Sequence, residues 1–592
     1  MCGFVALLSP GGQVPSLDGA LETLVHRGPD ARGTWTSGSG FCAFGHRRLS
    51  ILDLSDAGRQ PMTTLDGRYT IVFNGEVYNY VELREELGGR SAFRTATDTE
   101  VLLQAYARWG PACLDRLVGM FAFAIWDEHE QTLFAARDRF GVKPLFFHER
   151  QDGGLLVASE IKAIHAAGVP RVPDVTTWST YLGSGMYDHT SSTFWQGIQS
   201  LPPGGCLTWR PSGRVSIRTW YDLADAVLAQ GPDPRDAKAV GEELLGFLEE
   251  SVRLRFRSDV PVGICLSGGL DSSLLLALVR RVQGPESDVK TFTFFCGDPQ
   301  YDEVPWVEEM LARTRHPACF CRLRAEDVPR LALDVQSFQD EPFGGVPTMA
   351  MAMVHKRARA EGVVVLLDGN GLDEAWGGYE YYARASLTDP ASGPVQGART
   401  PSTRPDCLEP DFASLASPFR SPQPFGDSLR DLQYRDVRYA KIPRAMRFAD
   451  RVSMMFSREL REPFLDHRIV ELGLRQAVDH KIRAGQGKWL PRQIVQELLP
   501  EKVRESPKRP VQTPQREWLR GSLREWAGEQ IGLALSTYGD VWLNRAAVQK
   551  AWREYCDGVG DNSFYVWQWI NLALWSQCSA RSAEPSVELS RS

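Results

Sequence analysis

The second residue of the chain is a cysteine, Cys2, and it is followed by Gly3. If the initiator methionine is removed, the α-amino group of Cys2, with an intrinsic pKa of about 8, can take the thiol proton directly or through a water. One residue then supplies both a nucleophile and its base, and the small Gly3 lets a substrate approach. An incidental cysteine is the alternative reading of this position taken by itself.

A second chemical signal is the stretch CLSGGLDSSLLLALV at 265–279. It predicts a strand end, a Gly-Gly loop and a helix that begins near Ser272. Loop amides and a helix N-terminus bind anions, and glycine lets the backbone approach phosphate closely. Asp271 would offer the oxygen ligands that Mg²⁺ prefers. The stretch is not a Walker loop, and a glycine turn with an N-cap Asp is the plain structural alternative.

A third signal is VLLDGNGLDEAWGGY at 365–379, an apolar strand followed by a glycine-punctuated loop and an acidic pair. Loops that follow strands in this way often hold phosphate or metal in α/β enzymes. Asn370 stands in the middle of the loop, and its neutral amide cannot serve as a carboxylate base.

These residues need a scaffold, and the first 210 residues predict a mixed, largely antiparallel α+β domain. Short apolar runs separated by turn residues, as in 69–80 and 119–147, indicate strands, and helical periodicity appears in 17–28 and 98–110. We expect an antiparallel β-sandwich flanked by helices over 1–210, followed by a polar linker over 211–239.

From about residue 240 the pattern changes to strands that alternate with helices. Apolar strands are expected within 261–266, 290–295 and 362–367. This alternation predicts a doubly wound α/β nucleotide-binding domain with a parallel sheet over 240–578. Residues 387–427 are rich in Pro, Ser, Gly and Thr and are predicted to be a flexible insertion, and 579–592 a disordered tail.

Composition excludes several classes of protein. The net charge is −7, from 67 basic and 74 acidic residues, so a cationic surface for nucleic acid is not expected. No apolar stretch reaches the ~18–20 residues that cross a bilayer, and the N-terminus lacks the features of a signal peptide. We expect a cytoplasmic protein without membrane or nucleic-acid partners, with mostly reduced thiols, and a homodimer is left open.

Five further motifs follow Cys2 along the chain. They are HRGPD at 26–30, HRRLSILD at 46–53, FNGEVYN at 73–79, TDTEV at 97–101 and RDRFGVKPLFF at 137–147. In this order and spacing they resemble the glutaminase domain of class II, N-terminal-nucleophile glutamine amidotransferases, in the form found in asparagine synthetases. The resemblance implies that Cys2 forms a thioester with glutamine, releases ammonia, and then releases glutamate to water.

The same resemblance implies a role for five more residues. Arg48 would fork onto the α-carboxylate of glutamine, a bidentate task for which lysine is poorly suited. Glu76 and Asp98 would hold the α-ammonium. Asn74 and the backbone N–H of Gly75 would form the oxyanion hole. Asp98 by itself can also be read as a helix N-cap, and both interpretations can hold.

The loop at 267–273 resembles the S-G-G-x-D-S-S loop of ATP pyrophosphatases, which cleave ATP between the α and β phosphates. The resemblance assigns ATP binding to Leu266, Ser267, Gly268, Gly269, Asp271, Ser272, Phe294, Asp368 and Gly369. Leu266 and Phe294 would contact adenosine, although both could equally be core residues. Asp271 and Asp373 are the implied Mg²⁺ ligands.

Lys508 falls where the family has the lysine that stabilises charge developing at the reacting carboxyl and phosphate. Its surroundings depart from the usual R-x-K-x-G, since Ser506 replaces the arginine and Pro510 the glycine. The block DRVSMMFSRELREPFLD at 450–466 resembles the D-R-x-S-M…E-x-R-x-P-F-L-D block of asparagine synthetases. We expect it to form a packed helix with an acidic and basic network.

The resemblance to asparagine synthetases covers about residues 1–525. It implies that ATP adenylates a carboxylate and releases pyrophosphate, and that ammonia from the glutaminase travels internally and attacks the acyl-adenylate. The products would be a carboxamide, AMP and glutamate. The implied cofactors are ATP and Mg²⁺, and the implied partners are small molecules: glutamine, ATP and a carboxylic acid.

The second loop departs from this family. Typical members read S-G-E-G-x-D-E, whereas Asp368 and Asn370 replace the Ser and the Glu here. That Glu is implicated in handling the ammonia proton and the aspartate, and related β-lactam-forming synthetases carry a Tyr at the position. Asn370 and Glu374 are therefore candidate acceptor-site residues.

Several hypotheses about the reaction remain. The acceptor is aspartate, or it is another acid such as a sugar acid or a natural-product acid. An intramolecular amide-forming synthetase is disfavoured by the intact glutaminase motifs, and a non-catalytic scaffold by the retained Mg²⁺-type aspartates.

Overall fold

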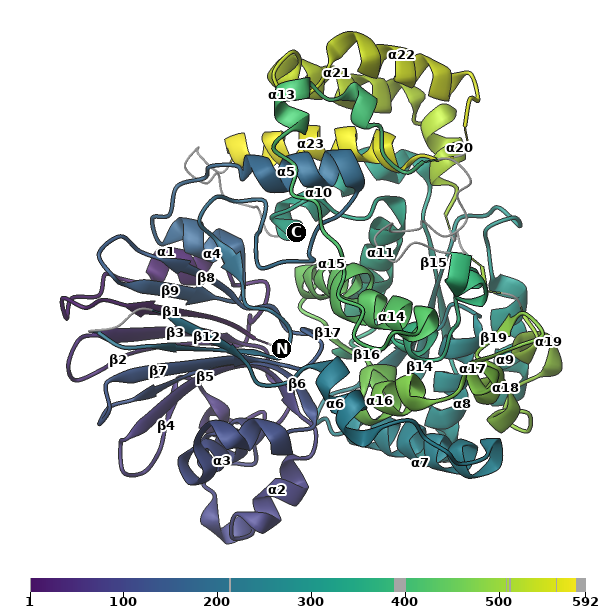
Figure 1. The fold of residues 1–592 in the computed structure, drawn as a ribbon. Coiled ribbons are helices and arrows are strands. Elements are labelled where there is room, and N and C mark those ends of the chain that lie inside the picture. Colours follow the sequence, from purple (N-terminus) through teal and green to yellow (C-terminus); the bar gives the residue numbers. More distant parts are fainter. Residues whose placement is uncertain are drawn as a thin grey trace.

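The computed structural model describes residues 2–211, 215–387, 401–506, 508–509, 513–560 and 562–581. Figure 1 shows a strand-rich N-terminal lobe beside a larger lobe in which helices surround a second kind of sheet. Over the described residues no helix combines the length and apolar character needed to cross a membrane.

The N-terminal lobe is a sandwich of two six-stranded sheets. The first sheet runs in the order β10 (Gln199–Ser200), β8 (Phe146–Glu149), β9 (Leu155–Ala158), β1 (Gly3–Leu8), β3 (Cys42–Arg48) and β2 (Ala31–Thr36). The second runs in the order β12 (Ser216–Thr219), β11 (Gly205–Trp209), β7 (Thr132–Arg137), β6 (Gly119–Asp127), β5 (Tyr69–Val77) and β4 (Met62–Thr63). All pairings between these strands are antiparallel, which confirms the predicted sandwich.

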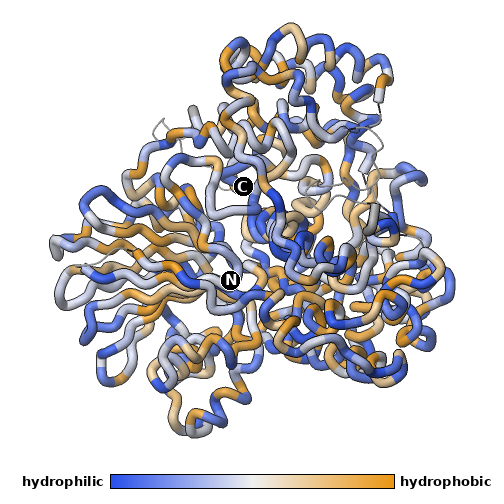
Figure 2. Tube along the Cα trace, in the orientation of Figure 1, coloured by the Kyte–Doolittle hydropathy of each residue, from blue (hydrophilic) through white to orange (hydrophobic). Residues whose placement is uncertain are grey.

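The two sheets pack through a shared apolar core that includes Phe4, Phe44 and Trp126. In Figure 2 the hydrophobic stretches follow the strands of this sandwich. Helices α1 (Asp18–Glu22) and α4 (Ile161–Ala166) pack on the first sheet, and α2 (Tyr80–Glu86) and α3 (Asp98–Trp109) on the second. Strand β12 pairs with β11, so the sandwich continues into the segment that we expected to be a linker.

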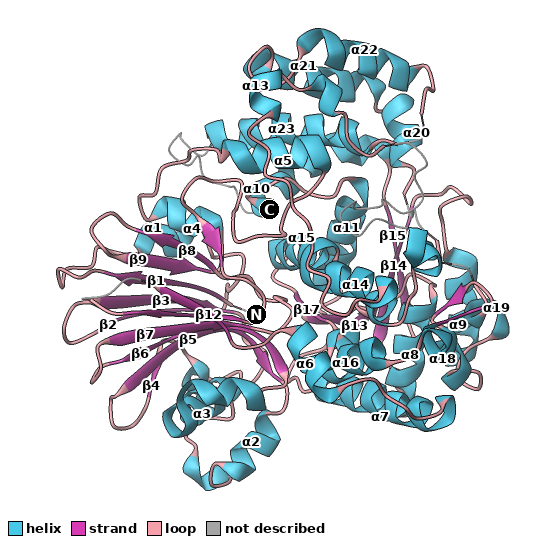
Figure 3. Ribbon diagram, in the orientation of Figure 1, coloured by secondary structure: helices cyan, strands magenta, loops and turns pink. Residues whose placement is uncertain are grey.

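The second lobe is built on a five-stranded sheet in which every pairing is parallel. Its order is β15 (Ala318–Arg322), β14 (Lys290–Phe295), β13 (Val262–Cys265), β16 (Val365–Leu367) and β17 (Glu459–Arg461). Helices α7 (Ala237–Arg255) and α8 (Leu270–Gln283) pack together in one apolar cluster, and α11 (Val346–Ala360) and α15 (Ile442–Met455) in others. Figure 3 shows these helices around the sheet, and the predicted doubly wound α/β domain is confirmed.

The remaining helices and one small sheet complete this lobe. They are α6 (Leu223–Gln230), α9 (Val304–Thr314), α12 (Leu372–Ala375), α14 (Ser428–Arg435), α16 (His467–Arg475), α17 (Val478–Lys481), α18 (Trp489–Ile494), α19 (Glu501–Arg504) and α20 (Gln515–Arg520), with β18 (Ile482–Arg483) pairing β19 (Gln486–Gly487). The block 450–466 is not one packed helix as expected. Helix α15 ends at Met455, and β17 and a 3₁₀ turn (Pro463–Leu465) follow, because residues 459–461 add the edge strand to the sheet.

A helical layer with many tryptophans lies over both lobes. It contains α5 (Val175–Ser184), α10 (Val328–Gln339), α21 (Arg524–Tyr538), α22 (Arg545–Cys556) and α23 (Phe564–Arg581). Trp178 of α5 meets Trp575 of α23 with ring centroids 4.9 Å apart. The N-terminal 210 residues therefore contribute a helix to a core that the C-terminal helices share.

The predicted flexible insertion at 387–427 is described only from residue 401 onward. In that part α13 (Pro410–Ala413) carries the buried Phe412, which stacks on Trp542 at 4.9 Å. The hydroxyl of Ser179 donates to the Phe412 carbonyl at 2.7 Å. This part is packed rather than loosely attached, because its apolar side chains complete the tryptophan-rich layer. Residues 388–400, and the predicted tail beyond Arg581, lie outside the described residues.

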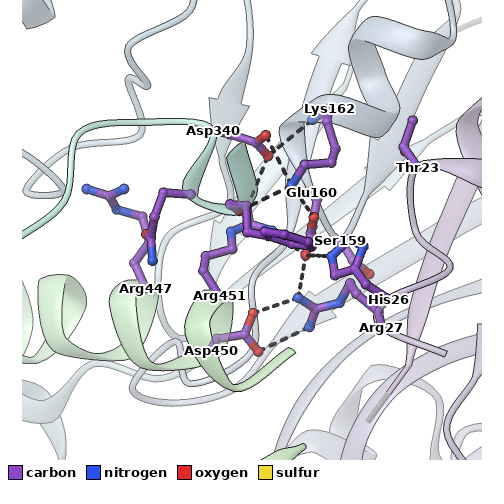
Figure 4. A network of polar contacts seen from close by, with 12 residues as sticks. Thr23, His26, Arg27, Ser159, Glu160, Lys162, Asp340, Arg447, Asp450 and Arg451 are labelled. Carbon is purple, nitrogen blue, oxygen red and sulfur yellow. Dashed lines mark hydrogen bonds and ion pairs between the residues drawn. The ribbon is translucent and has the colours of Figure 1, made fainter. Parts of the chain in front are cut away.

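A buried ionic network joins the sandwich to helix α15 (Figure 4). The Arg27 guanidinium donates to Asp450 Oδ2 at 2.8 Å and Oδ1 at 3.1 Å, and to Glu160 Oε1 at 2.7 Å. Arg451 Nη1 lies 2.8 Å from the same Glu160 oxygen. The Arg27 and Glu160 side chains are fully buried, so residues far apart in the chain fix how the two lobes meet.

Candidate active sites

The first candidate site lies at the start of β1. The Cys2 nitrogen, which is the α-amine once the initiator methionine is removed, donates to Asn74 Oδ1 on β5 at 3.0 Å. Strands β1 and β5 belong to different sheets of the sandwich, so the nucleophile and the predicted oxyanion-hole residue meet between the sheets. Burial raises the pKa of the Cys2 thiol. A base close to the sulfur is therefore needed to form the thiolate.

The structure brings the other predicted glutamine-site residues to the same place. A cavity of about 30 Å³ is lined by Cys2, Arg48, Gly75, Glu76 and Asp98, together with Leu49, Ile51, Leu52, Gly58, Gln60, Phe73, Thr97 and Thr99. Residues from four separate sequence motifs thus face one small volume beside the nucleophile.

The predicted oxyanion hole has one donor with no protein partner. Asn74 Nδ2 is buried and makes no hydrogen bond within the part of the chain that the structure describes. Gly75 has a φ of 151°, and a Cβ there would lie 2.1 Å from the Met120 carbonyl oxygen. Glycine is therefore required at this position, and a buried unpaired amide aimed at the site suits an oxyanion.

Arg48 is held by the loop that follows β3. Its guanidinium donates to the carbonyl oxygens of Leu52 at 3.1 Å, Asp53 at 2.5 Å and Ser55 at 2.8 Å. Three backbone acceptors fix the plane of the guanidinium at the wall of the cavity, which suits recognition of a planar carboxylate.

Glu76 and Asp98 form an acidic wall. Burial raises the pKa of the Glu76 carboxyl well above its usual range, and the charges of Glu459 and Asp98 raise it further. Burial also raises the pKa of Asp98 to about 6. A ligand ammonium placed between these carboxyls would favour their ionised forms. Asp98 is not the helix N-cap that we considered, because the Thr97 hydroxyl caps α3 by accepting from the Glu100 N–H.

The second lobe contributes to this first site, which the sequence analysis did not anticipate. Arg461 on β17 places Nη2 3.5 Å from Glu76 Oε1 and Nε 2.6 Å from Glu459 Oε1. Glu459 and Arg461 belong to the block 450–466, whose resemblance to the E-x-R-x-P-F-L-D pattern was the available signal, although we expected a packed helix there.

The second candidate site lies at the carboxyl edge of the parallel sheet. Strand β13 ends at Cys265, and α8 begins at Leu270, slightly earlier than predicted. The Ser267 N–H donates to the Ser272 hydroxyl at 3.1 Å, and the two hydroxyls are 3.0 Å apart, which closes the loop. Gly268 has a φ of 85°, and a Cβ there would lie 2.9 Å from the Glu303 carbonyl oxygen. The loop therefore needs glycine for its conformation.

Cationic side chains surround this loop. A cavity of about 50 Å³ is lined by Ser267, Gly269, Leu270, Asp271, Ser272 and Glu303, with Lys488, Arg492, Ser506, Lys508 and Arg509. Four positive charges at the N-terminus of α8 make a strong site for a polyphosphate. Only Lys508 was predicted. Lys488, Arg492 and Arg509 lie in no motif that we recognised, and only the tertiary structure gathers them.

Asp271 and Asp373, the predicted metal ligands, lie together. The Lys488 Nζ is 2.7 Å from Asp271 Oδ1 and 2.5 Å from Asp373 Oδ1, and the Lys508 Nζ is 2.5 Å from Asp373 Oδ2. Burial opposes the charge of Lys508, but the carboxylates outweigh it and raise the pKa of the ammonium. For Asp373 the two lysines outweigh burial and lower the pKa.

This carboxylate pair fits Mg²⁺ bound together with a nucleotide. A positive charge already lies between the two carboxylates, and carboxylate oxygens are the ligands that Mg²⁺ prefers. In the described ranges no group of three or more His, Cys, Asp or Glu side chains could hold a metal unaided. Phosphate oxygens of the nucleotide would therefore have to complete the coordination.

The remaining predicted ATP contacts divide into two groups. A Cβ on Gly369 would lie 3.2 Å from the Ser272 N, so the second loop packs directly on the first. Leu266 is buried in the apolar core, and its carbonyl accepts from Thr293 at 2.6 Å. Phe294 is half-buried between two apolar clusters. The interpretation of Leu266 and Phe294 as core residues therefore agrees with how their side chains pack.

The two acceptor-site candidates have different surroundings. Burial raises the pKa of Glu374 to about 7, and Tyr379 donates to its Oε1 at 2.6 Å. The Asn370 Nδ2 lies 3.1 Å from Asp368 Oδ2, 3.3 Å from Glu462 Oε1 and 3.4 Å from Glu462 Oε2. Glu462 was not predicted, because it stands at an unspecified position of the P-F-L-D block.

A larger cavity, about 110 Å³, lies elsewhere, between residues 188–203 and α15. None of the predicted site residues lines it. Its charged side chains pair with one another, as in the 2.8 Å contact between Arg447 Nε and Asp188 Oδ2. We therefore place the chemistry at the two smaller cavities, where the nucleophile and the anion-binding loop lie.

The antiparallel sandwich begins with a buried cysteine and is joined to a parallel-sheet domain with a Ser-Gly-Gly loop. Together, these two domains define a glutamine amidotransferase coupled to an ATP-dependent synthetase, which is an enzyme of the ligase type. Comparison with protein-family models agrees. Residues 1–221 match the glutamine amidotransferase domain and residues 243–577 match the asparagine synthase model. The chain belongs to the asparagine synthase family, as the resemblance in its sequence predicted.

One known relative matches along the whole chain, and others match along most of it. Asparagine synthetase [glutamine-hydrolyzing] 1 of Bacillus subtilis (strain 168) is 29% identical and aligns with 100% of this chain and 99% of its own length. Asparagine synthetase [glutamine-hydrolyzing] 3 of the same organism is 31% identical over 89% of each chain. Amidase chry2 of Gibberella zeae is 33% identical over 66% of this chain and 61% of that protein.

Proposed function

We propose that the enzyme hydrolyses glutamine at Cys2 and uses the ammonia to convert a carboxylic acid into its carboxamide, with ATP cleaved to AMP and pyrophosphate. The observation that carries this proposal is the convergence of Cys2, Arg48, Glu76 and Asp98 on one cavity. An amide-forming synthetase that takes its amine from the substrate would have no use for such a cavity.

In the glutaminase half, Arg48 binds the α-carboxylate of glutamine, and Glu76 and Asp98 bind its α-ammonium. The thiol of Cys2 loses its proton to its own α-amine, and the sulfur attacks the side-chain amide carbon. The C–N bond then breaks, the α-amine returns the proton to the departing ammonia, and water hydrolyses the thioester to release glutamate. Asn74 Nδ2 and the Gly75 N–H donate to the oxygen that becomes negative. The Asn74 side chain also accepts a hydrogen bond from the Cys2 nitrogen at 3.0 Å. This contact fixes the position of the amine relative to the oxyanion hole.

In the synthetase half, the acceptor carboxylate attacks the α-phosphorus of ATP and pyrophosphate leaves. The Ser267–Ser272 loop and the N-terminus of α8 bind the phosphates, and Lys488, Arg492 and Lys508 neutralise the leaving group. Asp271 and Asp373 would hold Mg²⁺, which would neutralise phosphate charge when bound with ATP. Aspartate is the first acid to test, since relatives carry the name asparagine synthetase.

A second candidate function is amidation of an acid other than aspartate. The observation that favours it is the environment of Asn370, whose amide lies between two carboxyl groups, Asp368 and Glu462. An acceptor that approaches this loop meets a different set of charges from the Ser and Glu of typical members.

The cytoplasmic location and the possible homodimer stay predictions.

The experiment is ATP–pyrophosphate exchange with a panel of carboxylic acids that starts with L-aspartate, together with glutamine hydrolysis by the wild type and Cys2→Ala. We expect exchange with at least one acid, and glutamine hydrolysis that disappears in Cys2→Ala. Robust exchange with L-aspartate followed by asparagine formation would identify the acceptor. No exchange with any acid, or no glutamine hydrolysis by the wild type, would refute the proposal.

A further inference from the structure

Glu462 reaches the second ATP loop through the register of two parallel strands. Leu367 on β16 lies opposite Arg461 on β17, so the residues that follow, Asp368 and Glu462, leave the sheet side by side at its carboxyl edge. The Asp368 N–H donates to the Arg461 carbonyl at 3.0 Å, which continues the pairing by one residue. The carboxyl edge of a parallel sheet is where ligands bind in open α/β domains.

Asn370 connects the two carboxyl groups. One amide nitrogen, Nδ2, lies 3.1 Å from Asp368 Oδ2 and 3.3 Å from Glu462 Oε1. Glu462 is 3% exposed. Over the described ranges neither carboxyl forms an ion pair within 4.0 Å. The Gly369 N–H also donates to Asp368 Oδ1 at 2.7 Å. The two neighbouring carboxyls thus share the neutral side-chain amide of Asn370 in place of a cation, which is an unusual arrangement for a purely structural site.

The charges around Glu462 favour a retained proton. Burial raises the pKa of the Glu462 carboxyl well above its usual range, and the charge of Asp368 raises it further. The Asn370 amide and the more distant Lys143 oppose the shift only in part. Cys265 at the end of β13 also faces the pair, and Lys508 acts on Asp368. A carboxylate whose pKa is raised in this way is a stronger base than an ordinary carboxylate, which suits a general base.

The amide-forming step requires such a group. Ammonia attacks the acyl carbon of the adenylate, the new C–N bond forms, and the C–O bond to the phosphate of AMP breaks. The attacking nitrogen must lose one proton to become a neutral amide. Asn370 cannot take it, because a carboxamide is neither basic nor anionic.

We propose that Glu462 accepts the proton from the attacking nitrogen, and that Asn370 positions its carboxylate for this task. The inference rests on the proposed function and deepens it. Arg461 on β17 lies 3.5 Å from Glu76, which lines the glutamine cavity, and Glu462 is the next residue. Gly369 packs the loop that Glu462 contacts against Ser272 of the phosphate loop. Glu462 therefore stands between the source of ammonia and the site of adenylation.

The test separates adenylation from amidation in Glu462→Gln. Ammonium chloride replaces glutamine, and the acid is the one with the fastest exchange in the wild-type panel. We expect ATP–pyrophosphate exchange within about threefold of wild type and amide formation reduced by roughly 10²–10⁴-fold, the usual contribution of a general base. Glu471→Gln is the matched control. The Glu471 carboxylate on α16 accepts a hydrogen bond from the Tyr221 hydroxyl at 2.9 Å, and both rates should be unchanged in this variant.

Two further measurements exclude a merely structural role. The ammonia-dependent rate of the wild type, plotted against free NH₃, should fall as pH decreases through the pKa of Glu462, and this limb should be absent in Glu462→Gln. The double variant Asn370→Glu with Glu462→Gln exchanges the acid and the amide across the same contact, and amide formation should return to within about tenfold of wild type.

Three results would overturn the proposal. One is amide formation in Glu462→Gln within about threefold of wild type. Another is an equal loss of exchange and amide formation, which would indicate a structural role. The third is a double variant no more active than Glu462→Gln, which would mean that the contact, and not the carboxylate, matters. Absence of exchange in the wild type would instead refute the proposed function itself.

Discussion

The buried network between the lobes gives a stability prediction for Asp450→Asn. Asp450 accepts two hydrogen bonds from Arg27, at 2.8 Å and 3.1 Å, and the two side chains are 3% and 0% exposed. Burial opposes the charge of Asp450, but Arg27 and Lys143 outweigh it and lower the pKa of the carboxyl. The substitution keeps the shape of the side chain and removes its charge.

The expected loss of folding free energy depends on which hydrogen-bond and ion-pair partners Arg27 loses and which it retains. Breaking a buried ion pair from one side costs about 3–5 kcal/mol. Arg27 retains Glu160 at 2.7 Å, and an asparagine carbonyl can still accept one hydrogen bond. We therefore expect a loss at the lower end, about 3 kcal/mol. At roughly 2 °C per kcal/mol for a large domain, the melting temperature should fall by about 6 °C.

The assay is thermal unfolding of the full chain, with Asp56→Asn as the control. Asp56 pairs with Arg59 at 2.9 Å on the surface, with 83% of its side chain exposed, so its loss should leave the melting temperature unchanged. Because the folded pKa of Asp450 is depressed, its contribution is present above the unfolded pKa of about 3.9 and is lost as pH falls through the folded value. A melting temperature for Asp450→Asn within about 1 °C of wild type at pH 7 would refute the reasoning.

Three further predictions concern the two sites. Lys488→Met should reduce ATP–pyrophosphate exchange by about 10²-fold or more and leave glutamine hydrolysis intact, because it unpairs the carboxylates of the second site; exchange at the wild-type rate would contradict this. The KM for glutamine should be constant above pH 7 and rise as pH falls below about 6, because burial raises the pKa of Asp98 to about 6 and only its ionised form holds an ammonium. A flat profile down to pH 5 would argue against that role. Gly75→Ala should abolish glutamine hydrolysis and spare ammonia-dependent synthesis, since its Cβ would lie 2.1 Å from the Met120 carbonyl oxygen; Gly246→Ala, where a Cβ in helix α7 meets nothing within 4 Å, should preserve both.

Local patterns predicted the elements of both lobes well. Alternating apolar residues identified the long strands β5 and β6, and apolar runs followed by glycine loops identified β13 and β16. The failures occurred where tertiary contacts override a local pattern. Residues 459–461 extend the sheet as β17 although we expected a helix, and Thr97 rather than Asp98 caps α3.

The site was predictable where one motif carries its own geometry. The loop 267–272 is of this kind, because a glycine turn positions its side chains locally. Cys2 and Asn74 were each predicted from their motifs, but they meet only because β1 and β5 face each other across the sandwich. The cations Lys488, Arg492 and Arg509 follow no such motif. They face the phosphate loop only because α18 packs against α7, and α19 against α8 and α9.

The sequence by itself determined that this chain is a two-domain glutamine-dependent ligase, and it predicted the nucleophile, the phosphate loop and the unusual position of Asn370. Only the tertiary structure decided what Asn370 contacts. Glu462 lies 92 positions further along the chain, and it meets Asn370 because parallel pairing sets Arg461 opposite Leu367. Strand register is fixed by which apolar faces must be buried together in the folded sheet, and a short motif carries no information about that partner.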